Sequence, residues 1–180
     1  MNAPLAERLR PKKLSDYISQ SHLIGPQGAL TQALNQGLIP SMIFWGPPGI
    51  GKTTLATIIA QESGRPFYTL SAISSGVKDV REVIEKAKQG GGLFTTKNPI
   101  LFIDEIHRFS KSQQDSLLGA VEQGVVTLIG ATTRSGLLTS PLRARFGIKL
   151  LLEYYNTDIL RSIVERSATI LKIETSKEYK

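Results

Sequence analysis

The sequence predicts an α/β fold built around a buried parallel sheet, and two observations predict it. The first is a glycine-rich loop, residues 46–54, with an apolar run before it and a helical pattern after it. The second is the alternation of short apolar runs with helical spacings along the chain, which is typical of parallel sheets with right-handed crossovers. At 180 residues the chain is long enough for one domain with a substantial core.

The loop at residues 46–54 reads Gly-Pro-Pro-Gly-Ile-Gly-Lys-Thr-Thr and matches the G-x-x-x-x-G-K-[ST] pattern of a phosphate-binding loop. The apolar run 42–45 predicts a strand before it, and residues 55–62 keep a helical spacing. A strand, a glycine loop and a helix point backbone N–H groups at phosphate oxygens. The alternative is a plain Gly/Pro turn with a solvated lysine.

We therefore expect this loop to bind ATP or ADP together with Mg²⁺. Lys52 is expected to reach the β- and γ-phosphates, and the Thr53 hydroxyl to bind Mg²⁺. The residues expected to contact the nucleotide are Gly46, Pro47, Pro48, Gly49, Ile50, Gly51, Lys52, Thr53 and Thr54.

Composition argues against several other classes of protein. No apolar run is long enough to cross a bilayer, and residues 1–11 do not resemble a signal peptide, so we expect a cytoplasmic protein without a membrane role. Cysteine is absent and the two histidines stand alone, so we expect neither disulfides nor a zinc site. The net charge of +7 suits a polyanionic partner such as nucleic acid, and equally a plain surface with excess lysine.

The segment before the phosphate loop predicts a basic arm and one helix. Residues 1–26 are irregular and basic, and they end in a Gly-Pro turn. Residues 29–38 space their apolar side chains as one helix face. The elements predicted after the loop helix are strand 66–70, helix 77–89, a flexible loop at 90–98, strand 99–103, helix 112–123, strand 125–129, helix 141–145, strand 148–152 and helix 157–171, capped by Thr157.

Two acids, Asp104 and Glu105, directly follow the continuous apolar run 99–103. The carboxyl ends of parallel strands form the edge where open α/β sheets bind ligands. In a chain with a phosphate-binding loop these acids form a Walker B element. We expect Asp104 to hold Mg²⁺ and Glu105 to orient and deprotonate the attacking water. The alternative is an acidic start to the next helix, stabilised by the helix dipole.

Adjacent catalytic acids are common in ring-forming AAA+ ATPases, and two later segments resemble parts of that family. Residues 129–133 end a strand in two hydroxyls, where AAA+ proteins keep a polar residue that senses the γ-phosphate. Thr133 is the expected sensor and Thr132 the alternative. Residues 140–146 resemble the segment that supplies an arginine finger to a neighbouring subunit. Arg145 is the expected finger and Arg143 a supporting contact, because a guanidinium is planar, always charged and bidentate toward phosphate. The alternative is two surface arginines.

The resemblance is divided between two groups of this family. Residues 2–131 resemble the RarA/MgsA ATPases of replication-fork maintenance, which are relatives of clamp-loader subunits, and residues 132–173 resemble RuvB, the Holliday-junction branch-migration motor. We hypothesise a hybrid gene, because the change falls inside the shared Gly-Ala-Thr-Thr at 130–133. The stretches that carry the two resemblances are 9–18, 41–49, 71–78 and 104–115 for the first, and 132–148 and 163–168 for the second.

The resemblance implies the large subdomain of a AAA+ ATPase, a five-stranded parallel sheet in the order 5-1-4-3-2 sandwiched by helices. It divides the chain into an N-terminal arm near the nucleotide (1–26), the ATPase core (27–155) and the first helix of an incomplete lid (156–180). Tyr17 and Ile18 would pack against the adenine, although they could equally just anchor the arm. His107 is expected to be structural and Trp45 to lie in the core.

The implied function is ATP hydrolysis coupled to the remodelling of branched or forked DNA, by a homo-oligomeric ring, in recombination, repair or fork maintenance. An incomplete lid would lack the family's second sensor arginine and weaken hydrolysis, so the alternative is a nucleotide-dependent assembly module without motor activity. RuvB-type proteins carry a β-hairpin between Walker B and the sensor strand. Here one helix uses most of residues 106–126, so docking of a RuvA-like partner is not expected.

Overall fold

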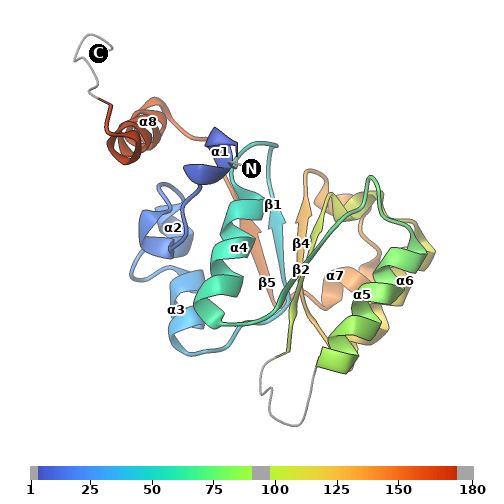
Figure 1. The fold of residues 1–180 in the computed structure, drawn as a ribbon. Coiled ribbons are helices and arrows are strands. Elements are labelled where there is room, and N and C mark those ends of the chain that lie inside the picture. Colours follow the sequence, from blue (N-terminus) through green and yellow to red (C-terminus); the bar gives the residue numbers. More distant parts are fainter. Residues whose placement is uncertain (1–3, 91–97, 174–180) are drawn as a thin grey trace.

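A computed structural model describes residues 4–90 and 98–173 of the chain. Its centre is a five-stranded parallel sheet in the order β2-β3-β4-β1-β5, which is the predicted order read from the other edge (Figure 1). The parallel α/β fold is therefore confirmed. The strands are β1 Met42–Trp45, β2 Phe67–Ser71, β3 Ile100–Asp104, β4 Thr127–Thr132 and β5 Ile148–Leu151.

Helices cover both faces of this sheet. In Figure 1, α4 lies against one face and α5 and α6 lie against the other, while α8 stands apart from the sheet beside α1. The helices are α1 Leu5–Arg8, α2 Ser21–Ile24, α3 Ala29–Asn35, α4 Lys52–Ser63, α5 Val77–Gly90, α6 Lys111–Glu122, α7 Ser140–Ala144 and α8 Thr157–Leu171, with the short 3₁₀ turns η1 Leu14–Asp16, η2 Ile106–Arg108 and η3 Ser135–Leu137.

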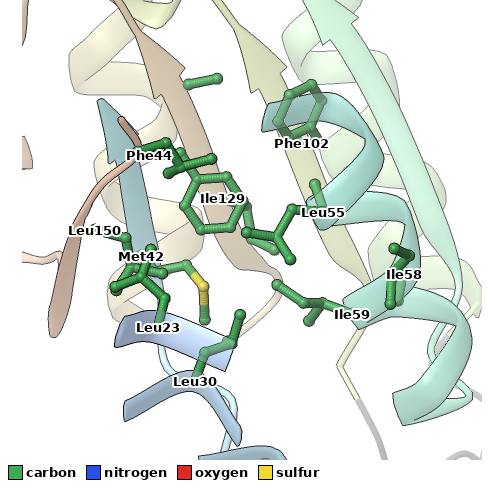
Figure 2. Close-up of a cluster of buried hydrophobic side chains, with 14 of the residues drawn as sticks. Leu23, Leu30, Met42, Phe44, Leu55, Ile58, Ile59, Phe102, Ile129 and Leu150 are labelled. Carbon is green, nitrogen blue, oxygen red and sulfur yellow. The ribbon is translucent and has the colours of Figure 1, made fainter. Parts of the chain in front are cut away.

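Alternating strand positions fill two cores, one on each face of the sheet. On the α4 face, Leu55 and Ile59 lie against Phe44 of β1 (Figure 2). On the other face, Ile43 of β1 belongs to the cluster that includes Leu117 of α6. The central strands are buried on both sides, as the continuous apolar runs predicted.

The predicted helices form where the sequence supplies their ends. Ser110 and Gln113 form a reciprocal capping box at the start of α6, and Gly124 follows its end with a φ of +66°. The start of α8 was assigned to the wrong residue. Asn156 rather than Thr157 caps this helix, because the Asn156 Oδ1 accepts a hydrogen bond from the Ile159 backbone N–H at 2.9 Å.

Three other predictions about local structure were wrong. The N-terminal arm is not irregular throughout, since α1, η1 and α2 lie within residues 4–26. β4 begins and ends later than predicted, because its pairing with β3 starts at Thr127 and its pairing with β1 continues to Thr132. Trp45 is 38% exposed instead of buried, since it ends β1 beside Leu151 of the edge strand β5, which is equally exposed.

The interval between Walker B and the sensor strand contains η2 and α6, and no strand lies within residues 106–126, all of which the structure describes. The predicted loop at 90–98 lies almost wholly outside the described residues. Among the described residues no helix is long and apolar enough to span a membrane.

Candidate active site

The loop between β1 and α4 requires glycine at two positions. Gly46 has a φ of +147° and Gly51 a φ of +86°, conformations that glycine adopts without a steric cost. A Cβ atom on Gly46 would lie 2.3 Å from the Leu152 carbonyl oxygen, and one on Gly51 would lie 2.7 Å from the Tyr17 hydroxyl. The close approach of neighbouring segments therefore fixes the shape of this loop.

Lys52 opens α4 and is only 7% exposed. Its Nζ donates to the carbonyl oxygens of Gly46 at 2.9 Å and Pro47 at 2.7 Å, so the ammonium group lies inside the curve of the loop. Burial lowers the pKa of Lys52, and the nearby carboxylates of Glu105 and Asp104 act in the opposite direction. The loop thus holds a buried cation that is close enough to both Walker B acids for their charges to act on its pKa.

Asp104 and Glu105 lie where β3 ends. Burial raises the pKa of Asp104, while a hydrogen bond from the Glu105 backbone N–H to its Oδ1, at 3.0 Å, acts against that rise. Glu105 has a left-handed backbone conformation with a φ of +51°, which is uncommon for a residue other than glycine and is often found at functional sites. This turn directs the Glu105 side chain toward the end of β4.

The end of β4 meets Glu105 directly. The Thr133 hydroxyl donates to Glu105 Oε2 at 3.2 Å, and Thr133 is exposed, whereas Thr132 is completely buried. The Thr132 Oγ1 lies 2.8 Å from His107 Nδ1, and the same nitrogen lies 3.3 Å from Glu105 Oε2. Burial lowers the pKa of His107, and the Glu105 carboxylate opposes that shift.

His107 therefore contacts the candidate catalytic group, which sequence reasoning did not foresee. The available signal was its position in a tight turn directly after the strand, since η2 carries the residue back toward the end of the sheet.

A pocket of about 370 Å³ lies beside the phosphate loop. Tyr17 and Ile18 line it, as do Gly49, Thr54 and residues of α8 such as Arg166. Arg166 also donates to the Leu9 carbonyl oxygen at 2.9 Å, which ties α8 to the N-terminal arm. Sequence reasoning missed the contribution of α8, because no local pattern indicates which face of that helix meets the arm.

Tyr17 both anchors the arm and borders this pocket. It is 6% exposed, and its hydroxyl donates to the Ile50 carbonyl oxygen at 3.1 Å. Tyr155, which sequence reasoning also missed, donates to the same carbonyl at 2.7 Å. Burial raises the pKa of Tyr17 far above its ordinary value, so this hydroxyl keeps its proton as a donor.

Arg145 lies at the opposite edge of the sheet from the phosphate loop. Gly147, two residues on, donates its backbone N–H to the carbonyl oxygen of Ser41, directly before β1, whereas the loop begins directly after β1. Arg145 is exposed and forms an ion pair with Glu122 at the end of α6. The structure thus brings together the loop, both acids and Thr133, but not Arg145, and Arg143 is likewise exposed on α7.

The residues present fit a magnesium ion that arrives with a nucleotide. Within the described residues, no cluster of three or more His, Asp or Glu side chains could hold a metal ion alone. Mg²⁺ commonly takes one or two protein oxygen ligands together with phosphates and water. The Thr53 hydroxyl and the half-buried Asp104 carboxylate are oxygen donors of that kind.

Comparison with known proteins agrees with this geometry. The family model for "ATPase family associated with various cellular activities (AAA)" matches residues 42–154. Replication-associated recombination protein A of Coxiella burnetii is 48% identical over 166 residues, which are 91% of this chain and 37% of that protein. The Holliday junction branch migration complex subunit RuvB of Chlorobaculum tepidum is 42% identical and matches 95% of this chain and 54% of its own length.

A solved structure of the RuvB Holliday junction branch migration motor from Thermotoga maritima superimposes with a TM-score of 0.78 at 38% identity, over 92% of this chain and 56% of that one. The chain therefore spans between about a third and just over a half of the length of these three relatives. RarA and RuvB are both among its relatives, as predicted, while the division of the resemblance near residue 131 stays a prediction. The matched family model and the parallel sheet with its phosphate loop show that the chain belongs to the AAA family of ATPases.

Proposed function

We propose that this chain is the nucleotide-hydrolysing core of an ATPase that remodels branched or forked DNA in recombination, repair or replication-fork maintenance. One observation carries the hydrolytic part of the proposal. The phosphate loop, Asp104 and Glu105 lie at one edge of the sheet, and the Thr133 hydroxyl there donates directly to Glu105. This is the set of groups that phosphoryl transfer to water needs, namely phosphate binding, metal binding, a base and a polar sensor.

Each group has a distinct role in the proposed reaction. Lys52 exchanges its carbonyl partners in the loop for phosphate oxygens, which are stronger acceptors because they are charged. Thr53 and Asp104 hold Mg²⁺, which neutralises phosphate charge when bound. Glu105 accepts the proton of the attacking water, and Thr133 senses the terminal phosphate.

The pocket beside the loop is proposed to take the adenine. Tyr17 and Ile18 line it on the side of the N-terminal arm, and α8 closes the other side. The hydrogen bond that anchors Tyr17 does not compete with this role. Its hydroxyl donates to the Ile50 carbonyl oxygen while the residue still lines the pocket.

The reaction is proposed to need a homo-oligomeric ring. Arg145 lies at the amino ends of the strands, separated from the loop by the length of β1, about 13 Å for four residues. A residue placed there suits the nucleotide of a neighbouring subunit better than its own. A RuvA-like partner is not part of this proposal, since residues 106–126 contain a turn and a helix instead of a hairpin.

Two observations support DNA as the partner of a cytoplasmic motor of this kind. Its relatives include one whose name describes replication-associated recombination and one named for Holliday-junction branch migration. The net charge of +7 also suits a polyanion. Membership of an ATPase family favours hydrolysis over the alternative of an assembly module that barely turns over.

The test is steady-state ATP turnover, measured without DNA, with a linear duplex and with a four-way junction or fork of the same length. We expect Mg²⁺-dependent turnover whose rate per subunit rises with protein concentration and rises further with the branched DNA. Turnover that no DNA changes would contradict the remodelling function. Tight ATP binding without turnover, at every concentration and with every DNA, would favour the assembly module.

A further inference from the structure

Two side chains, from adjacent strand ends, converge on one carboxylate oxygen of Glu105, and a third side chain contacts one of the two. Glu105 Oε2 accepts a hydrogen bond from the Thr133 hydroxyl at 3.2 Å and lies 3.3 Å from His107 Nδ1. His107 Nδ1 in turn lies 2.8 Å from the Oγ1 of Thr132, the last residue of β4. His107 therefore bridges the Walker B turn and the sensor strand.

The neighbours of His107 Nδ1 decide which ring nitrogen carries the proton. An ionised carboxylate can only accept hydrogen bonds, so a bare Nδ1 lone pair would be repelled by Glu105. A protonated Nδ1 instead donates toward both Thr132 and Glu105. Thr132 Oγ1 also accepts from the Arg134 backbone N–H at 2.9 Å, which uses its second lone pair. The contacts to Glu105 thus favour a proton on Nδ1.

The two donors to Glu105 are not equivalent. Thr133 has a single hydroxyl proton and is exposed at the site, so a terminal phosphate would compete with Glu105 for that proton. His107 has a side chain that is 7% exposed, and it is held by the buried Thr132. Of these two donors, His107 is the one that stays in contact with Glu105 when the Thr133 hydroxyl donates to a phosphate.

We infer that His107 is a positioning residue for Glu105, which fixes the carboxylate relative to the sensor strand while Thr133 contacts the nucleotide. This inference rests on the proposed ATP hydrolysis. Glu105 lies in a left-handed turn. Among the hydrogen bonds of the described residues, its carboxylate is contacted by Thr133, and its backbone N–H donates to Asp104. His107 therefore supplies a contact to the Glu105 carboxylate that neither the phosphate loop nor Asp104 provides.

The decisive experiment compares two substitutions at one position. His107→Asn keeps an N–H donor on the γ-carbon, where Nδ1 is attached, whereas His107→Leu keeps a similar volume without a donor. Turnover and ATP affinity are measured for both. We expect His107→Leu to lower kcat by about 10- to 100-fold with little change in ATP affinity, the size of effect that a 1 Å displacement of a reacting group produces. His107→Asn should recover most of that loss.

Three further variants show whether the effect passes through Glu105 and Thr132. In a Glu105→Gln background, His107→Leu should cause no additional loss, because the group that it positions is already disabled. Thr132→Val should also lower kcat, as His107→Leu does. Thr132→Ser, which keeps the hydroxyl, should not lower it. Equal turnover in His107→Leu and the unsubstituted chain, or parallel losses of kcat and ATP affinity with no recovery in His107→Asn, would overturn the inference.

A measurement independent of turnover separates this inference from the proposed function. The chain has two histidines, so ¹⁵N NMR of labelled imidazoles, assigned with His22→Gln, reports the tautomer of His107. We expect a proton on Nδ1, and a changed Nδ1 signal in Thr132→Val. A proton on Nε2 alone would overturn the inference even if ATP is hydrolysed. Absence of hydrolysis with the expected tautomer would instead refute the proposed function.

Discussion

The hydroxyl of Tyr17 donates a hydrogen bond to the carbonyl oxygen of Ile50 at 3.1 Å, across 33 residues of sequence. Tyr155 donates to the same carbonyl from the other end of the domain, at 2.7 Å. Both hydroxyls also lie within 3 Å of the position that a Cβ on Gly51 would occupy. The phosphate loop is therefore held in shape by the N-terminal arm and by the segment after β5, and not by its own glycines alone.

Tyr17→Phe should loosen the phosphate loop without creating a cavity in the core. The substitution removes one buried hydrogen bond and keeps the ring, so the free energy of unfolding should fall by about 1 kcal/mol, and ATP affinity should fall a few-fold with it. Thermal unfolding and nucleotide titration measure the two effects. Tyr154→Phe is the matched control, since Tyr154 is 75% exposed. If the two variants had the same stability and ATP affinity, the hydrogen bond of Tyr17 would not stabilise the phosphate loop.

Lys52→Ala should abolish tight nucleotide binding. It removes the buried ammonium group that the loop now holds through Gly46 and Pro47, and a charge-assisted hydrogen bond is worth about 1.5–3 kcal/mol. Isothermal titration with ATP should show a loss of about tenfold or more, whereas Lys149→Ala, at an exposed position of β5, should bind normally. An affinity that changed by less than about twofold would refute the assignment of the phosphate loop.

Glu105→Gln should separate binding from hydrolysis. The amide oxygen can still accept from Thr133, so the local turn should survive, but the amide cannot take the proton of the attacking water. ATP affinity should stay within about twofold while turnover falls by about 10²–10⁴. Asp115→Asn, at an exposed site on α6, serves as the control. A parallel loss of affinity would mean that Glu105 supports the structure of the site and is not its base.

The sequence was sufficient for the parts of this molecule that depend on local patterns. The glycine loop, the two acids after β3 and the threonines that end β4 all follow apolar runs, and parallel strand order alone brings such ends together. Helix ends were predicted within a few residues for the same reason, although the cap of α8 was shifted by one, because Asn156 and Thr157 are both acceptable capping types.

Contacts between distant segments could not be predicted in this way. Trp45 was expected in the core, but its exposure depends on the edge strand that arrives more than a hundred residues later. The contacts of Tyr155 with Ile50 and of His107 with Thr132 likewise join residues far apart in sequence, and each depends on side-chain direction at a strand end. Periodicity indicates which face a residue occupies, but it does not indicate which polar atom it meets there.

Arg145 forms an ion pair with Glu122 on its own chain. Both side chains are exposed, with 51% and 39% of their surface accessible, so this ion pair contributes at most about 1 kcal/mol and can be exchanged for a phosphate. If Arg145 acts on a neighbouring nucleotide, Arg145→Ala should leave ATP affinity per subunit intact and lower turnover by about 10³ or more. Glu122→Gln, which frees the arginine, should keep or raise turnover.

Mixing two inactive variants tests the action in trans. Arg145→Ala keeps an intact phosphate loop and Lys52→Ala keeps an intact arginine, so a mixture should regain part of the turnover that each has lost alone, because some interfaces then combine both intact groups. The matched control is a mixture of Arg145→Ala with the Lys52→Ala, Arg145→Ala double variant, which offers no intact arginine and should stay inactive. Steady-state turnover of the unsubstituted chain should also rise more steeply than linearly with protein concentration. A dilute monomer that hydrolyses ATP well and is unaffected by Arg145→Ala would defeat the ring mechanism while leaving the phosphate loop and Glu105 assignments in place.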